Sequence, residues 1–72
     1  MNLNRRLLGE NIRVERMLLG LTQKELAEKL NNAPSRLCNW ERGTRTPSIE
    51  YLLKISHVLG ISISKLVSGI YS

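Results

Sequence analysis

The apolar residues of the chain recur in five successive segments at the three- and four-residue spacing of amphipathic helices. Four of these segments are followed by residues that tolerate the left-handed backbone with which helices end: Gly20, Asn31, Gly43 and Gly60. No stretch of useful length alternates strictly between apolar and polar residues, so strands are not expected. The pattern predicts an all-α fold of five helices, at about residues 5–18, 22–30, 34–42, 48–58 and 62–68.

Residues that favour helix starts stand where these segments begin. Thr22 and Glu25 have the spacing of a capping box, in which each side chain accepts a hydrogen bond from the other residue's backbone N–H. Pro34 suits the first turn of a helix, because a backbone N–H there would have no partner inside the helix. Ser48 and Ser62 can cap the last two helices. The starts and the stops therefore predict the same five helices.

The connection between the second and third predicted helices is very short, at residues 31–33. A turn of this length forces two helices to cross at a large angle, which is the arrangement of a helix-turn-helix unit. A chain of 72 residues is also too short to bury two separate hydrophobic cores. We therefore expect residues 1–72 to form one compact helix-turn-helix domain.

The third predicted helix has two different faces when its residues are placed about 100° apart. Leu37 and Trp40 fall on the apolar side. Arg36 lies at the edge of that side, and the opposite side holds Pro34, Ser35, Cys38, Asn39 and Arg42. In a DNA major groove, Ser35 and Asn39 can pair with base edges while arginines reach phosphates. An ordinary solvated face has the same composition, so the helix alone leaves both interpretations open.

The charge balance favours a polyanionic partner. Eleven Lys and Arg stand against six acidic residues, giving a net charge of +5 and a pI near 10.0. Excess charge can also serve solubility alone. Gln23 begins the second helix, where amide N–H groups favour a phosphate, and Thr44, Arg45 and Thr46 follow the third helix. These groups flank the polar face of the third helix, as contacts to the DNA backbone on either side of a groove require.

Three stretches of the sequence resemble the Cro/lambda-repressor-like, or Xre, helix-turn-helix family: GLTQKELAEKL (20–30), WERG (40–43) and TPSIEYLLKISHVLGIS (46–62). The resemblance covers about residues 8–67. It implies a five-helix domain that binds DNA sequence-specifically. It also implies that Gln23 contacts the DNA backbone or an adjacent base, that the positions of Pro34, Ser35 and Asn39 read bases, and that the loop after Gly43 touches phosphate.

The sequence departs from the family pattern around the turn. Asn31 replaces a glycine, Asn32 an apolar residue and Ala33 the usual Ser or Thr cap. Asn31 remains compatible with the turn because Asn tolerates a positive φ. Pro34 occupies a base-reading position, where it can offer only an apolar contact, such as one to a thymine methyl group.

The resemblance further implies an ion pair between Arg16 and Glu41 behind the third helix. Arg16 lies on the inner side of the first helix, in line with Leu8, Ile12 and Leu19, and Glu41 lies at the edge of the third helix's inner face. Such a pair would orient the third helix without touching DNA. The alternative is two independent surface charges.

The last third of the chain has more apolar residues than a small monomer readily buries. On the fourth helix, Ile49, Leu52 and Leu53 are expected to face the core. A homodimer interface is expected to use the remaining apolar residues of the fourth and fifth helices and the tail: Tyr51, Ile55, Val58, Ile61, Ile63, Val67 and Ile70. A two-fold dimer would place two recognition helices about one DNA turn apart. The alternative is that the fifth helix docks on the first and fourth.

These observations lead to two hypotheses for function. The first is a sequence-specific, double-stranded-DNA-binding transcriptional regulator, expected to be a repressor that binds a palindromic operator as a homodimer. The second is an antitoxin or other module that binds a toxin or other partner protein through the first helix and the C-terminal apolar surface.

Several classes of protein are not expected. One Cys and one His leave no set of metal ligands, and the sequence has no phosphate-cradling glycine loop, so neither an enzyme nor a cofactor is expected. No apolar run has the length of a membrane span or of a signal peptide. We therefore expect a cytoplasmic protein.

Overall fold

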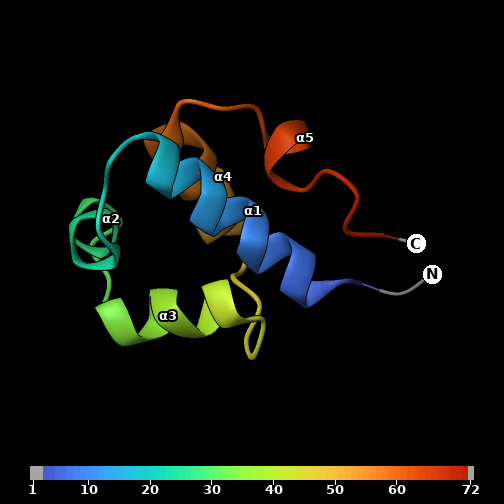
Figure 1. Cartoon of the computed structure of the whole chain (residues 1–72), viewed down its shortest axis with the longest axis horizontal. Helices are drawn as coiled ribbons and strands as arrows, with labels where there is room; N and C mark the ends of the chain where they lie inside the picture. Colours follow the sequence, from blue (N-terminus) through green and yellow to red (C-terminus); the bar gives the residue numbers. More distant parts are fainter. Residues whose placement is uncertain (1–2, 72) are drawn as a thin grey trace.

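Side-chain caps fix where four of the five helices begin. In the computed structural model, which describes residues 3–71, these caps are Asn4, Thr22, Ser48 and Ser62, and each accepts a hydrogen bond from an N–H in the first turn. The helices are α1 (Arg5–Leu18), α2 (Gln23–Lys29), α3 (Pro34–Arg42), α4 (Ile49–Leu59) and α5 (Ile63–Leu66) (Figure 1). The predicted all-α fold with five helices is confirmed.

The observed bounds differ from the expected ones by a few residues. The helices α1 and α3 have the bounds that the pattern predicts. The expected helix ranges begin at Thr22, Ser48 and Ser62, but these three residues have extended backbones and cap the helices that follow them. The last helix was expected to reach residue 68 and ends at Leu66, three residues before Gly69, which has a positive φ. It is therefore a single turn.

The capping box at the start of α2 is complete. Glu25 N–H donates to the Thr22 hydroxyl at 3.0 Å, and Thr22 N–H donates to the Glu25 carboxylate at 2.8 Å. The pKa of Glu25 is lowered, first by the backbone N–H of Thr22 and then by its hydroxyl. A carboxylate that is charged at neutral pH thus holds the beginning of α2 in place.

The turn between α2 and α3 depends on a left-handed residue. Asn31 has a φ of 55° and is the non-glycine residue with a positive φ in the described chain. Its N–H donates to the carbonyl of Glu28, and the N–H of Asn32 donates to that of Ala27. These two bonds close the end of α2 and let α3 leave at a large angle (Figure 1).

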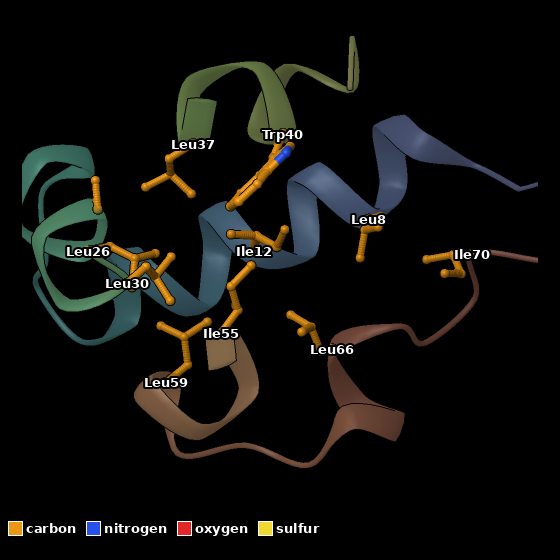
Figure 2. Packing of buried hydrophobic residues seen from close by; sticks show 11 residues of the cluster. Leu8, Ile12, Leu26, Leu30, Leu37, Trp40, Ile55, Leu59, Leu66 and Ile70 are labelled. Atoms are coloured by element: carbon orange, nitrogen blue, oxygen red, sulfur yellow. The ribbon is translucent and has the colours of Figure 1, made fainter. Parts of the chain in front are cut away.

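All five helices contribute to the core, and α1 runs through its centre (Figure 2). Ile12 is buried there with Leu8 of the same helix. The other buried apolar side chains come from the remaining helices, the end of α2 and the tail: Leu26, Ala27, Leu30, Leu37, Trp40, Ile55, Leu59, Leu66 and Ile70. Leu19 was expected on this inner stripe but is exposed, because it caps the end of α1 where the chain turns away.

The expected orientation of α4 is wrong. Ile49 and Leu53 were assigned to the core and are 66% and 53% exposed, whereas Ile55 is fully buried. The buried side of α4 carries Ile55 and Leu59 toward α1 (Figure 2). Apolar residues cover more than half of the circumference of this helix, and Glu50, Lys54 and His57 share the remaining side, so the apolar spacing alone does not single out one inner face.

The two ends of the described chain are tied together. Asn4 N–H donates to the carbonyl of Ile70 at 2.6 Å, and Leu3 and Tyr71 form an antiparallel bridge. The side-chain amide of Asn11 donates to the carbonyls of Leu66 and Ser68, at 2.9 and 3.1 Å. The tail thereby lies against α1.

No helix among residues 3–71 is long and apolar enough to cross a membrane.

The backbones of α1 and α3 approach closely at Gly9 of α1. A methyl group there would overlap the carbonyl oxygen of Trp40 and would lie 2.5 Å from that of Glu41. Both carbonyls belong to the backbone of α3, which cannot move without shifting the whole helix. Gly9 therefore sets the distance between α1 and α3.

We expect the substitution Gly9→Ala to lower the free energy of unfolding by about 1–3 kcal/mol, because the added methyl group overpacks this contact. In an unobstructed helix the same change raises stability by up to about 1 kcal/mol, so the sign of the effect is diagnostic. Urea denaturation followed by circular dichroism measures it. The exposed neighbouring change Glu10→Ala is the control and should stay within about 0.5 kcal/mol. A more stable Gly9→Ala variant would contradict the close approach.

Candidate nucleic-acid interface

The two faces of α3 have separate environments. Leu37, Trp40 and Glu41 are buried against the rest of the domain. On the opposite side Cys38 and Asn39 are half-buried, and the other residues of the predicted reading face are exposed: Pro34, Ser35, Arg36 and Arg42. The helix forms one outer edge of the domain, on the far side of α1 from α5 (Figure 1). Its polar face is therefore accessible to a partner as large as a DNA duplex.

The loop after α3 folds back onto Asn39. The N–H groups of Thr44 and Arg45 donate to the Asn39 carbonyl at 3.1 and 3.4 Å, and the Thr44 hydroxyl lies 3.2 Å from the same oxygen. This hydroxyl also lies 3.4 Å from Oδ1 of the Asn39 side chain. The exposed side chains of residues 44–46 thus lie directly beside the third helix.

This loop requires a glycine at residue 43. Gly43 has a φ of 79°, and a Cβ there would lie 2.9 Å from the Cα of Arg6. Both the left-handed backbone and the approach to α1 exclude a side chain. The position of the loop relative to α1 is therefore fixed by the backbone itself.

An open hollow of about 490 Å³ lies between α3, the loop and the start of α4. It is lined by Ser35, Arg36, Asn39, Trp40, Arg45, Thr46, Ser48 and Tyr51. The lining includes two arginines and four hydroxyl groups and has no acidic residue, which suits a phosphate. Ser48 and Tyr51 were not among the expected DNA contacts. For Ser48 the sequence offers one indication of such a contact, namely that it is a hydroxyl residue directly after the loop.

Behind the helix, Arg16 and Glu41 form the ion pair that the sequence resemblance implies. Arg16 Nε lies 2.7 Å from Glu41 Oε2, and Arg16 Nη2 lies 3.0 Å from Oε1. A third guanidinium nitrogen donates to the carbonyl of Leu21 at 2.6 Å. The side chains are only 12% and 3% exposed, so these are not independent surface charges. The pair joins α1, the loop before α2 and α3.

Gln23 does not stand free at the start of α2. It is half-buried, and its Nε2 donates to Glu41 Oε1 at 3.1 Å. Sequence reasoning placed Gln23 beside the DNA but missed this hydrogen bond. No spacing rule could have found it, because the bond crosses the turn between α2 and α3 and depends on how the two helices pack.

The residues expected at a dimer interface fall into three groups. Ile55 and Ile70 are 0% and 3% exposed and belong to the core, so assigning them to a dimer interface is corrected. Tyr51 is half-buried against Trp40, with ring centroids 5.2 Å apart, and lines the hollow. The remaining four are half-buried around α4 and α5: Val58, Ile61, Ile63 and Val67.

Comparison with known proteins identifies the family. The sequence pattern of the helix-turn-helix family matches residues 12–66, which is more than half of the chain. The chain belongs to this helix-turn-helix family. The resemblance to Cro/lambda-repressor-like proteins is thereby confirmed, and the matched region includes α2, α3, the loop and α4.

One curated relative of this helix-turn-helix protein is the HTH-type transcriptional regulator ImmR of Bacillus subtilis (strain 168). It is 42% identical over 60 residues, which cover 83% of this chain and 47% of ImmR. The chain spans about half the length of the curated relatives it matches.

Two solved structures of regulators bound to DNA have the same fold. The biofilm master regulator SinR in complex with DNA superposes with a TM-score of 0.80 at 40% identity, covering 85% of this chain and 98% of that one. The P22 c2 repressor in complex with a synthetic operator also gives a TM-score of 0.80, at 32% identity, covering 86% and 94%.

We expect the substitution Glu41→Ala to lower the free energy of unfolding by about 3–5 kcal/mol, because it leaves the buried Arg16 charge without its partner. Urea denaturation monitored by Trp40 fluorescence measures the loss. The exposed acid Glu28 on α2 provides the control, since Glu28→Ala should change stability by no more than about 0.5 kcal/mol. Equal effects of the two substitutions would show that the ion pair does not support the fold.

Proposed function

We propose that this chain is a sequence-specific DNA-binding transcriptional regulator that places α3 in the major groove. The observation that carries the proposal is the continuous polar and cationic surface made by the outer face of α3 and the loop after it. The inner face of α3 is fully used in the core, so its outer face is free for a ligand. The width of an α-helix matches that of the major groove.

The residues of this surface divide by their chemistry. Ser35 and Asn39 would hydrogen-bond to base edges, and Pro34 would offer an apolar contact to a thymine methyl group. The groups that would contact phosphates flank the helix on both sides: Gln23, Arg36, Arg42, Thr44, Arg45 and Thr46. Ser48 and Tyr51 complete the hollow beside Arg45 and would contact the same backbone segment.

The relatives support the role as a regulator. ImmR is a transcriptional regulator by name, SinR was solved with DNA, and the P22 c2 protein is a repressor solved on its operator. We extend this role, including repression, to the present chain. Such a protein would act in the cytoplasm by binding alone, without catalysis or a cofactor.

We further propose that the chain binds a palindromic operator as a homodimer. The apolar residues left half-buried around α4 and α5 are the surface for this dimer: Val58, Ile61, Ile63 and Val67. A two-fold axis through this surface would repeat α3 on the same face of the DNA.

One observation favours a second candidate function, binding of a toxin or other partner protein. The end of α1 carries three exposed apolar residues in sequence, Met17, Leu18 and Leu19. They lie outside the α3 surface, so a partner there could be bound with or without DNA. A failure of the chain to select any DNA sequence from a random pool would favour this second function.

Binding-site selection from random duplex DNA tests the proposal. A homodimeric regulator should enrich an inverted repeat whose half-sites are centred about one helical turn apart. A single enriched half-site would support base reading and contradict the dimer. Salt-sensitive binding without any enrichment would contradict sequence-specific function and would favour the partner-binding module.

Two substitutions should separate base reading from phosphate binding on the selected duplex. Asn39→Ala should weaken binding by about 1–3 kcal/mol and relax preference at one base position. Arg45→Ala should weaken all sequences alike and reduce the slope of log K against log salt by about 1. Fluorescence anisotropy at several salt concentrations measures both. Lys65→Ala on α5 is the charge-matched control, since α5 lies far from α3, and it should leave the slope unchanged (Figure 1). Identical behaviour of Arg45→Ala and Lys65→Ala would contradict the assigned surface.

A further inference from the structure

The hydrogen bond between Gln23 and Glu41 fixes which way the Gln23 carboxamide faces. A carboxylate accepts hydrogen bonds and has none to give, so the NH₂ group of Gln23 must be turned toward Glu41 Oε1, 3.1 Å away. The carbonyl oxygen and the second N–H of Gln23 then point away from Glu41. The orientation follows from the chemistry of the two groups.

The carboxylate that holds Gln23 is itself immobile. Arg16 binds both oxygens of Glu41 through Nε and Nη2, and Glu41 is almost completely buried. Bidentate pairing of this kind fixes the plane of the carboxylate as well as its position. Arg16 also neutralises the charge of Glu41, so the carboxylate can support Gln23 without repelling a nearby phosphate.

We propose that Glu41 is a positioning residue for DNA binding. It acts through Gln23, because it holds the free side-chain N–H of Gln23 in the direction of a phosphate oxygen. This inference rests on the proposed function. Glu41 therefore has two separable effects, one on stability through Arg16 and one on affinity through Gln23. The second arises because a side chain already ordered in the free protein loses less freedom on binding.

A double-mutant cycle on operator affinity tests this role. Gln23→Ala should weaken binding of the selected duplex about tenfold, since it removes a charge-assisted hydrogen bond. Glu41→Gln should weaken binding about fivefold more when Gln23 is present than in the Gln23→Ala background, where only its effect through Arg16 remains. A structural role alone would weaken binding equally in both backgrounds, and that result would overturn the inference.

The matched control is Glu28→Gln, which makes the same change in net charge on an exposed position of α2. It should give no coupling with Gln23→Ala. Urea denaturation at the temperature of the binding assay shows whether each variant is folded there. If Glu41→Gln does not fold, the cycle is run with Glu41→Asp, which keeps the charge opposite Arg16 but withdraws the carboxylate from Gln23. The same coupling with Gln23→Ala is expected there.

Other results distinguish failure of this inference from failure of the proposed function. If the unaltered chain binds DNA and Gln23→Ala has no effect, Gln23 is not a contact and the inference is overturned while the function stands. In the free protein, NMR should show the Gln23 side-chain NH₂ resonances shifting in Glu41→Gln and remaining in place in Glu28→Gln. If the unaltered chain selects no DNA sequence, the proposed function fails, and the inference fails with it.

Discussion

The fold of this small domain depends on how α3 is held against α1. Two features act together there. Gly9 lets the backbones of the two helices approach closely, and the buried Arg16–Glu41 pair fixes their mutual orientation. Arg16 also binds the carbonyl of Leu21 and so ties the loop before α2 to the same point. An uncompensated charge in this place would be strongly unfavourable, so the arrangement exists only when all partners are present.

Because of this constraint, α3 presents only its outer face to solvent, since its inner face is buried. Leu37 and Trp40 fill the core, while the loop after Gly43 folds back beside Asn39. The outer face, the loop and the hollow between them form a single cationic surface. The fold thus supplies a rigid support for a few exposed side chains that decide what is bound. On α3 these include Ser35 and Asn39, and in the loop they include Arg45 and Thr46.

Much of this could be predicted from the sequence because it depends on local chemistry. The caps at Thr22, Ser48 and Ser62 and the left-handed Asn31 and Gly43 act within a few residues of themselves, and α3 has clearly divided faces. The orientation of α4 could not be predicted, since its apolar residues cover more than half of the helix and the packing against α1 and α5 decides which of them are buried. The Gln23–Glu41 bond and the burial of Ile70 likewise depend on contacts between distant segments.

The DNA-binding surface that we propose consists of the outer face of α3 and the loop after it. The most direct test is an NMR titration of the isotope-labelled chain with the selected duplex, following backbone amide shifts. We expect the largest changes on the outer residues of α3, on residues 44–46 and at Gln23. Changes concentrated on α4 and α5, with α3 unaffected, would contradict the proposal.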